Sequence, residues 1–239
     1  MEPRLILPGT VLSDTIRFSE ADERHIFRSL RLRKGGRIVI ADGNGCEALC
    51  ELTADRAAKV LETRPSKGEP PAPVHLYPSL SKGDRFDRLL QKAVEFGVTS
   101  VTPVLSERCV AGVPSPVKWE RYRKIMRSAA EQSGRGIIPE LRDALDFKDA
   151  GASARGLRIF CYENEHTISL RAVFREGVTE TSVMTGPEGG YTEEEAAFAE
   201  QNGWKSVSLG NTILRCETAP LMPLAAIRFL SMLTEGTDG

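Results

Sequence analysis

Two glycine-containing loops carry the residues best suited to bind a small ligand. The first is the run Thr185-Gly186-Pro187-Glu188-Gly189-Gly190, which lies between an apolar predicted strand and a predicted helix. Glycine lets a backbone approach a ligand closely at such a turn. No Gly-Lys-Ser/Thr follows and the Gly-x-Gly-x-x-Gly pattern is absent, so neither a nucleoside triphosphate nor NAD is favoured. On spacing alone, a tight strand-to-helix turn without a ligand is an equally good interpretation.

The second loop runs from Leu209 to Ala219 and contains Gly210, Arg215 and Glu217. Loops after parallel strands meet at the carboxyl edge of a sheet, so the two loops are expected to line one pocket. Taken alone, Arg215 and Glu217 are more typical of a salt bridge at a helix start than of catalytic groups. Glu163 follows another predicted strand and is expected either beside this pocket or on an exposed loop.

Positive charge is concentrated in two segments. Residues 24–37 contain six Lys or Arg and no carboxylate, and residues 118–135 carry a local excess of four positive charges. Such densities can bind phosphates, although each segment taken alone is more typical of a solvated helix face. The whole chain has 32 basic and 33 acidic residues and a net charge of −1. This balance excludes only a protein that is basic over its whole surface.

The N-terminal part is predicted to be mostly β. A hairpin is expected over residues 37–52 around Asp42-Gly43-Asn44-Gly45, followed by a strand at 58–63, with one helix starting near Ser19. Four prolines in the nine residues 65–73 predict a stiff connector. We therefore expect two domains, comprising residues 1–73 and 74–239.

The second domain alternates between strand and helix patterns. The predicted strands are 74–78, 98–105, 157–162, 182–185 and 206–209, and the predicted helices are 82–96, 117–133, 167–175, 192–202 and 217–233. Alternation of this kind predicts an α/β fold in which helices cover both faces of a parallel sheet.

The composition of the chain indicates whether the protein spans a membrane, is secreted or binds a metal. No apolar run reaches the roughly 18 residues of a membrane helix, and the N-terminus has no secretory signal pattern. We therefore expect a cytoplasmic protein without a membrane span. Five scattered cysteines and three histidines indicate neither a disulfide framework nor a metal site.

Taken together, the motifs resemble those of the bacterial 16S ribosomal RNA uracil-N3 methyltransferases, which belong to the SPOUT class. The resemblance rests on Gly186-Pro187-Glu188-Gly189-Gly190 and Ile213-Leu214-Arg215-x-Glu217-Thr218-Ala219. It extends to the runs at 91–98, 106–109 and 131–135, and to His25, Ser29-Leu30-Arg31 and Gly35. Thr212, where the family often has a basic residue, and Pro220, early in the last helix, depart from the pattern.

The resemblance implies a small N-terminal PUA-like β-barrel and a SPOUT domain with a C-terminal trefoil knot. It also implies a homodimer that binds S-adenosylmethionine and methylates N3 of a specific uridine in 16S rRNA, in the assembled 30S subunit. Two alternatives stay open: a SPOUT methyltransferase acting on another RNA or atom, and a non-catalytic RNA-binding ribosome-assembly factor.

The loops, the basic segments and the resemblance together give the expected site residues. Arg215 is expected to stabilise negative charge on a uracil oxygen, and Glu217 to remove the N3 proton or orient Arg215. The cofactor-binding residues are expected to be Glu163, Thr185, Gly186, Pro187, Glu188, Gly189, Gly190, Leu209, Gly210, Ile213 and Leu214. The RNA-binding residues are expected to be His25, Arg28, Arg31, Arg33, Lys34 and Arg135.

Overall fold

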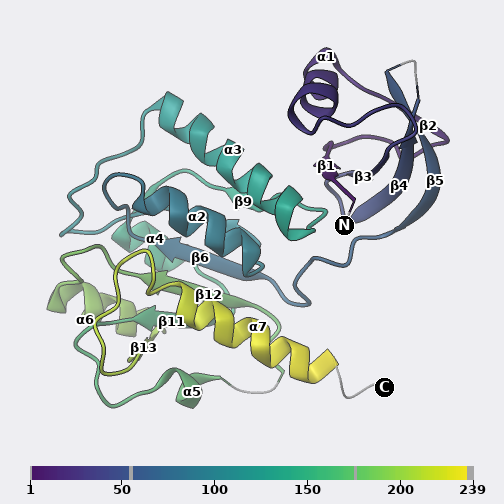
Figure 1. Ribbon diagram of the computed structural model, residues 1–239. Coiled ribbons are helices and arrows are strands. Elements are labelled where there is room, and N and C mark those ends of the chain that lie inside the picture. The colour runs from purple at the N-terminus through teal and green to yellow at the C-terminus, as the bar shows by residue number, and fades with distance from the viewer. Residues whose placement is uncertain (1, 54–55, 175–176, 236–239) are drawn as a thin grey trace. The chain divides into compact units, whose positions relative to one another are not determined.

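The computed structural model describes residues 2–53, 56–174 and 177–235, with side chains up to residue 232 (Figure 1). The chain divides into two compact units. The first comprises residues 1–69 and 127–138, and the second comprises residues 70–126 and 139–239. The first part of α3 (Pro116–Ser133) therefore belongs to the second unit, and its last turns belong to the first.

The first unit is built on a five-stranded sheet with the order β1-β3-β4-β5-β2. Its strands are β1 (Arg4–Ile6), β2 (Thr15–Arg17), β3 (Arg37–Ala41), β4 (Cys46–Leu52) and β5 (Ala57–Pro65). Only β1 and β3 pair in parallel. The predicted hairpin is confirmed: Asp42 Oδ1 accepts hydrogen bonds from the backbone N–H groups of Asn44 (2.7 Å) and Cys46 (3.0 Å), which closes the β3–β4 turn.

The helix predicted near Ser19 exists, but it changes type. Ser19 Oγ accepts a hydrogen bond from Asp22 N (3.2 Å) and caps α1 (Glu20–Glu23), which continues as the π-helix η1 (Arg24–Ser29). Within η1 only Ile26 is fully buried, and it packs on the apolar core of this sheet. The other residues of η1 are thereby left at or near the surface.

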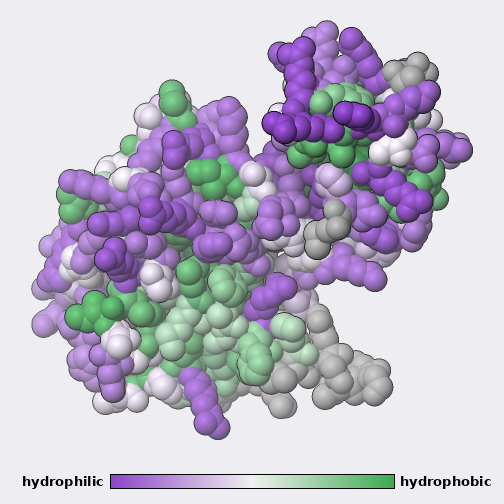
Figure 2. Space-filling view, in the orientation of Figure 1, coloured by the Kyte–Doolittle hydropathy of each residue, from purple (hydrophilic) through white to green (hydrophobic). Residues whose placement is uncertain are grey.

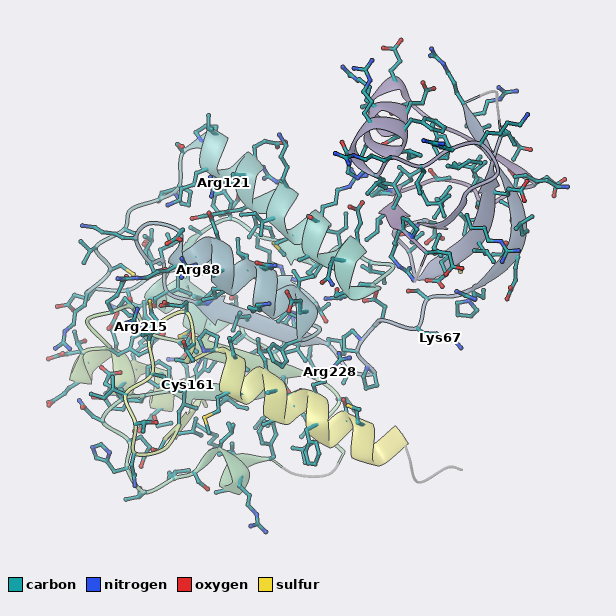
Figure 3. The ribbon with its side chains drawn as sticks, viewed as in Figure 1. Lys67, Arg88, Arg121, Cys161, Arg215 and Arg228 are labelled. Carbon is teal, nitrogen blue, oxygen red and sulfur yellow. The ribbon has the colours of Figure 1, made fainter. Side chains whose placement is uncertain are left out.

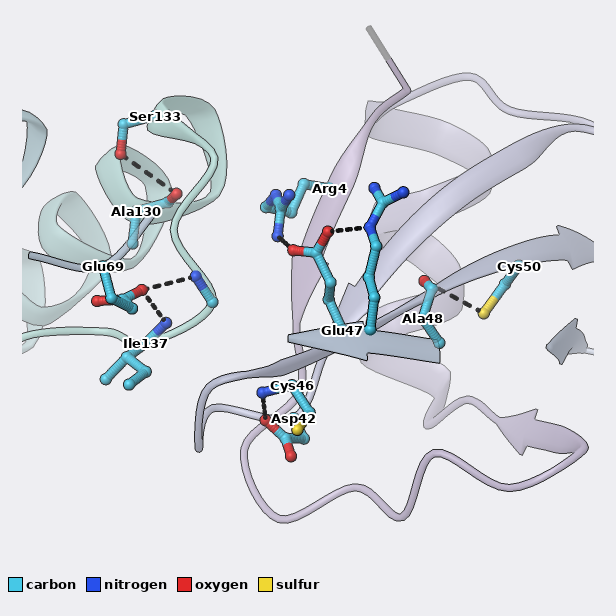
Figure 4. A network of polar contacts seen from close by, with 12 residues as sticks. Arg4, Asp42, Cys46, Glu47, Ala48, Cys50, Glu69, Ala130, Ser133 and Ile137 are labelled. Carbon is cyan, nitrogen blue, oxygen red and sulfur yellow. Dashed lines mark hydrogen bonds and ion pairs between the residues drawn. The ribbon is translucent and has the colours of Figure 1, made fainter. Parts of the chain in front are cut away.

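Two carboxylates organise the polar contacts of the first unit (Figure 4). Glu47 is almost fully buried and pairs with Arg4 and Arg64. Glu69 binds the buried Arg135 guanidinium at 2.7 Å and accepts backbone hydrogen bonds from Gly136 (2.9 Å) and Ile137 (3.0 Å). These contacts explain why the segment after α3 belongs to this unit, whose first part ends at residue 69.

The second unit is built on a six-stranded parallel sheet with the order β13-β11-β12-β6-β7-β9. Its strands are β6 (Val74–Pro78), β7 (Ser100–Val101), β9 (Glu140–Leu141), β11 (Leu157–Cys161), β12 (Thr181–Thr185) and β13 (Lys205–Val207). A short parallel pair, β8 (Val104–Leu105) with β10 (Leu145–Asp146), lies beside it. The single strand predicted over 98–105 is wrong, because Pro103 lacks an N–H group and separates β7 from β8.

The helices of this unit are α2 (Arg85–Glu95), α3, α4 (Phe147–Ser153), α5 (Leu170–Val173), α6 (Glu193–Gln201) and α7 (Leu221–Glu235). Helices α4 and α6 share one apolar core with the side chains of Phe160 and Met184. Helix α2 packs on α3 through Phe86 and Tyr122, whose ring centroids are 5.0 Å apart, and it also contacts α7. The α/β architecture with a parallel sheet is as predicted.

Short sequence motifs determine where two of the helices begin. The Thr192–Glu195 capping box is present as predicted, with hydrogen bonds of 3.1 and 2.9 Å, and α6 begins directly after Thr192. Helix α7 begins at Leu221 instead of the predicted residue 217. Pro220 lies just before its first residue, while residues 215–219 form turns closed on Arg215 O. No helix in the described ranges is long and apolar enough to cross a membrane.

Candidate functional site

Three loops meet at the carboxyl edge of the parallel sheet. Thr185, the last residue of β12, is in register with Pro78 of β6 and with Cys161 of β11. The chain segments that leave these strands therefore start side by side, and Ser79 N donates a hydrogen bond to Thr185 O at 2.9 Å. This edge is where open α/β sheets bind their ligands.

Glu163 holds the glycine loop, residues 186–190, from one side. Its carboxylate accepts a hydrogen bond from Tyr191 N at 2.7 Å. Gly190 has a φ of +68°, and a Cβ atom there would collide with the Glu163 carboxylate. The loop therefore requires glycine at position 190 for its backbone conformation and for this close approach.

Arg108 holds the same loop from another side. Its guanidinium donates hydrogen bonds to the carbonyl oxygens of Gly189 and Tyr191, both at 3.1 Å. Next to it, Glu107 N donates to the buried Glu195 carboxylate at 2.9 Å, which links this segment to the capping box of α6. Arg108 was not predicted as a site residue, and it acts by fixing the backbone of the glycine loop.

A pocket of about 440 Å³ opens beside this loop. Its lining residues come from the β6–α2 loop and the start of α2, the segment after β8, and the glycine loop: Lys82, Gly83, Asp84, Arg85, Val110 and Glu188. Arg85 Nη1 donates to Glu188 Oε1 at 2.7 Å. Burial acts to raise the pKa of Glu188, but hydrogen bonds from its own backbone N–H and from Arg85 lower it overall. Glu188 is therefore a firmly ionised carboxylate on the pocket wall.

The loop between β13 and α7 reaches the same region. The hydrogen bond and charge of Glu188, followed by the charges of Cys216 and Glu217, raise the pKa of Arg85. Cys216 Sγ donates to Glu217 Oε2 at 3.4 Å, and burial followed by this carboxylate raises the pKa of the thiol to about 11. Glu217 thus lies near Arg85, although spacing alone favoured an Arg215–Glu217 salt bridge.

The remaining predicted residues of that loop are more exposed. Arg215 is exposed, and no ion pair within the described part of the chain includes it. Figure 3 labels it on the loop that precedes α7. Leu209 and Leu214 are half-buried, whereas Ile213 is fully exposed. Gly210 has a φ of +103°, a conformation that favours glycine.

Two buried hydroxyl groups at the sheet edge lack hydrogen-bond partners. They are Thr185 Oγ1, at the start of the glycine loop, and Ser81 Oγ, in the β6–α2 loop, and neither has a partner among the described residues. Buried polar atoms are nearly always satisfied, so these atoms are suited to accept or donate a hydrogen bond to a ligand. Within the described ranges, no three His, Cys, Asp or Glu side chains are grouped as metal ligands.

The two basic segments differ in how their charges are used. In the first, His25, Arg28, Arg31, Arg33 and Lys34 are all exposed, and no ion pair in the described part of the chain includes any of them. In the second, ion pairs join Arg121 to Asp87, Lys124 to Glu120, Arg127 to Glu131 and Arg135 to Glu69. Arg135 is only 3% exposed. The unpaired positive charge is therefore concentrated in the first segment.

Two family models and several known proteins match this chain. Residues 68–228 match the family described as RNA methyltransferase domain, and residues 18–61 match the RNA methyltransferase PUA domain. The chain is 34% identical over 233 residues to a ribosomal RNA small subunit methyltransferase E of Synechocystis sp., covering 95% of this chain and 77% of that protein. It is 30% identical to the protein of the same name from Bacillus subtilis, covering 93% of each.

A solved structure gives the same result. The crystal structure of a ribosomal RNA small subunit methyltransferase E from Neisseria gonorrhoeae, bound to S-adenosyl methionine, superposes with a TM-score of 0.87 at 34% identity. The superposition covers 96% of this chain and 98% of that one. These comparisons confirm the resemblance found in the motifs and the PUA-like character of the N-terminal unit.

Proposed function

The chain belongs to the RNA methyltransferase family that includes the small-subunit ribosomal RNA methyltransferases E, and on this premise we propose that it methylates N3 of a specific uridine in 16S rRNA. S-adenosylmethionine is the methyl donor. The observation that carries the proposal is the glycine loop held between Glu163 and Arg108, beside a pocket with charged walls. A loop so braced is a preorganised binding surface rather than only a turn.

The site fits this cofactor. S-adenosylmethionine has an adenine, a sulfonium and polar groups but no phosphate, so it needs hydrogen-bond partners and apolar walls rather than a phosphate-binding lysine. The unsatisfied hydroxyls of Thr185 and Ser81 are suited to its polar groups. The residues that would hold it are Glu163, Thr185, Gly186, Pro187, Glu188, Gly189, Gly190, Leu209, Gly210, Ile213 and Leu214. When bound, it supplies an electrophilic methyl group.

The reaction exchanges a proton for a methyl group on the base. N3 of uracil loses its proton, its electron pair bonds to the methyl carbon, and the carbon–sulfur bond breaks to leave a neutral thioether. Arg215 stabilises the negative charge on a uracil oxygen, and Glu217 accepts the N3 proton or orients Arg215. Because N3 is on the Watson–Crick edge, the target uridine must be unpaired or flipped before it reacts.

The first unit binds the RNA through its unpaired basic segment. His25, Arg28, Arg31, Arg33 and Lys34 are exposed and free to contact phosphates. Arg135, which was predicted with them, instead has its guanidinium buried against Glu69, so its contribution is to hold the linker. The substrate is the assembled 30S subunit, and the enzyme acts in the cytoplasm.

We also propose a homodimer and a knotted C-terminal segment. Hydrophobic surface is gathered over α7 (Figure 2), where Met222, Phe229, Leu230 and Met232 are exposed. Apolar patches of this kind mark interfaces, and a second copy would cover this one. The knot is what the family resemblance implies for the segment from β13 to α7, and α7, which follows that segment, contacts α2.

Methylation of the natural substrate tests the proposal directly. The protein is incubated with isotope-labelled S-adenosylmethionine and either 30S subunits or free 16S rRNA, and the modified base is located by mass spectrometry. We expect one N3-methyluridine, formed in 30S subunits. Label at another atom or in another RNA would support the broader SPOUT alternative. Cofactor binding without label in any RNA would support the RNA-binding assembly factor.

A further inference from the structure

Arg85 is a cation in the pocket beside the glycine loop, and it has no part in the steps proposed for Arg215 and Glu217. Arg85, the first residue of α2, lines this pocket and is half-exposed. Its guanidinium is fixed at 2.7 Å from Glu188 and lies close to Glu217. Arg215, by contrast, is exposed and makes no ion pair among the described residues. Of the two arginines, Arg85 is the one that the fold already holds in a defined position.

The charges around Arg85 leave it available to a ligand. Three carboxylates lie nearby: Glu188 on the glycine loop, Glu217 on the β13–α7 loop and Asp84 on its own loop. Asp84 is engaged by Arg88 at 2.6 Å. Lys82 is the other cation of the pocket lining, and Val110 contributes no charge. The positive and negative side chains around this pocket are balanced, so a neutral uracil base would bind without a net electrostatic penalty. After the base loses its proton, the resulting anion could pair with the guanidinium of Arg85.

Arg85 also has hydrogen-bond donors left over for a ligand. A guanidinium has five N–H donors in one plane, and only one of them is donated to a described residue, to Glu188. The uracil anion formed by loss of the N3 proton presents O2, N3 and O4 along one edge as acceptors. A planar donor set held in place before the reaction is well suited to stabilise such an anion.

We propose that Arg85 is a catalytic residue that binds the N3-deprotonated uracil in the pocket lined by Lys82, Gly83, Asp84, Arg85, Val110 and Glu188. Glu188 is its positioning residue, because the 2.7 Å ion pair keeps the guanidinium at the pocket wall. This inference rests on the proposed uracil methylation, and it names a group that carries the charge of the reacting base.

Binding of a stable uracil anion tests the proposal without turnover. In 6-azauridine 5′-monophosphate the ring nitrogen makes N3 far more acidic than in uridine 5′-monophosphate, so near neutral pH the first ligand is the anion. With S-adenosylhomocysteine present, we expect the wild-type protein to bind the azauridine ligand about tenfold more tightly, equivalent to one charge-assisted contact. Arg85→Gln should remove this preference, and Arg85→Lys should retain part of it.

Arg142→Gln is the matched control. Arg142 is also a partly exposed arginine, paired with Glu140 at 2.8 Å, but it does not line the pocket. Its substitution should leave the preference unchanged. Equal affinities of the two ligands for the wild-type protein, or a preference that survives in Arg85→Gln, would overturn the role of Arg85.

Turnover separates this inference from the proposed function. If wild-type protein methylates 16S rRNA, Arg85→Gln should lower kcat at least tenfold and shift the rise of kcat with pH to higher pH, with cofactor affinity unchanged. The defect should shrink on RNA that carries 5-fluorouridine, whose N3 is more acidic. Wild-type turnover with an unaltered Arg85→Gln profile overturns only the role of Arg85. Absence of wild-type turnover overturns the proposed function, while the binding experiment still decides whether Arg85 selects the anion.

Discussion

Gly190 shows how a single missing side chain shapes the site. Its φ of +68° disfavours any other residue, and its Cα hydrogen faces the Glu163 carboxylate that holds Tyr191 N. In Gly190→Ala the new methyl group must displace either the loop or Glu163. We expect a loss of S-adenosylmethionine affinity of about 5- to 150-fold, since strain of this kind costs about 1–3 kcal/mol. Isothermal titration calorimetry measures the change.

Gly203→Ala separates this collision from backbone strain alone. Gly203 has a φ of +79°, but a Cβ atom there would have no neighbour within 4 Å. This variant should lose stability in urea by about 1 kcal/mol while binding the cofactor normally. If both variants bound the cofactor equally well, the glycine loop would not be the cofactor site.

The ionised side chain of Glu47 makes the stability of the first unit depend on pH in the acid range. Its side chain is 3% exposed, and its carboxylate pairs with Arg4 and Arg64. Burial acts to raise the pKa of Glu47, but hydrogen bonds from the two arginines lower it overall. A lowered pKa means that this stabilisation is fully present above the pKa of the unfolded carboxyl and is lost as pH falls through the folded value.

We therefore expect Glu47→Gln to lower the free energy of unfolding by about 3 kcal/mol at neutral pH, because it leaves the largely buried guanidinium of Arg4 without its ion-pair partner. The difference from wild type should shrink as pH is lowered toward the folded pKa. Urea unfolding at a series of pH values measures it. Glu51→Gln, at an exposed position on the same strand, is the control and should have little effect at any pH. A pH-independent loss in Glu47→Gln would contradict the linkage.

The exposed apolar side chains of helix α7 form the surface that the proposed homodimer would bury. Phe229 is 61% exposed and lies among the other exposed apolar side chains of this helix. A charge placed there would be buried in the proposed homodimer, so Phe229→Glu should convert dimer to monomer in sedimentation equilibrium. Val117→Glu is the control, because Val117 is an exposed apolar residue near the start of α3. Wild-type protein that sediments as a monomer would refute the homodimer.

Elements with strong local signals were predictable from the sequence. The capping box at Thr192 and Glu195 is formed entirely within one turn, so it located α6 correctly. Helix α4 was missed because Phe147–Ser153 is short and contains Gly151, a weak helix former that here packs against Phe198. Tertiary packing stabilises this helix, and no window of the sequence displays that packing.

The sequence alone predicted only part of the site, and the fold was needed to locate the rest. The glycine loop was found because its residues are consecutive, whereas Arg85 was missed although Gly83 stands in another loop between a strand and a helix. The rule that located the first loops applies equally to the one that follows β6. The pairing of Arg135 with Glu69 could not be predicted, because it joins residues 66 positions apart in the chain.

The salt dependence of RNA binding is determined by which cations are unpaired across the whole molecule. Arg28, Arg31, Arg33 and Lys34 are exposed and free of ion pairs within the described residues, whereas Arg121 and Lys124 already pair with carboxylates. Each phosphate contact adds about 0.7 to the slope of log K against log salt for single-stranded nucleic acid. Replacing the four free cations with Gln should therefore lower the slope for 16S rRNA by about 3, as measured by filter binding from low to physiological salt.

The double variant Arg121→Gln/Lys124→Gln is the control for this experiment. Removing a cation that is already neutralised by Asp87 or Glu120 releases few counterions, so its slope should fall by less than about 1. Similar losses per charge in the two variants would show that RNA breaks the ion pairs of α3 and uses both basic segments. A loss confined to the first segment would instead identify the N-terminal unit as the main electrostatic contact, since most of its basic side chains make no ion pair among the described residues.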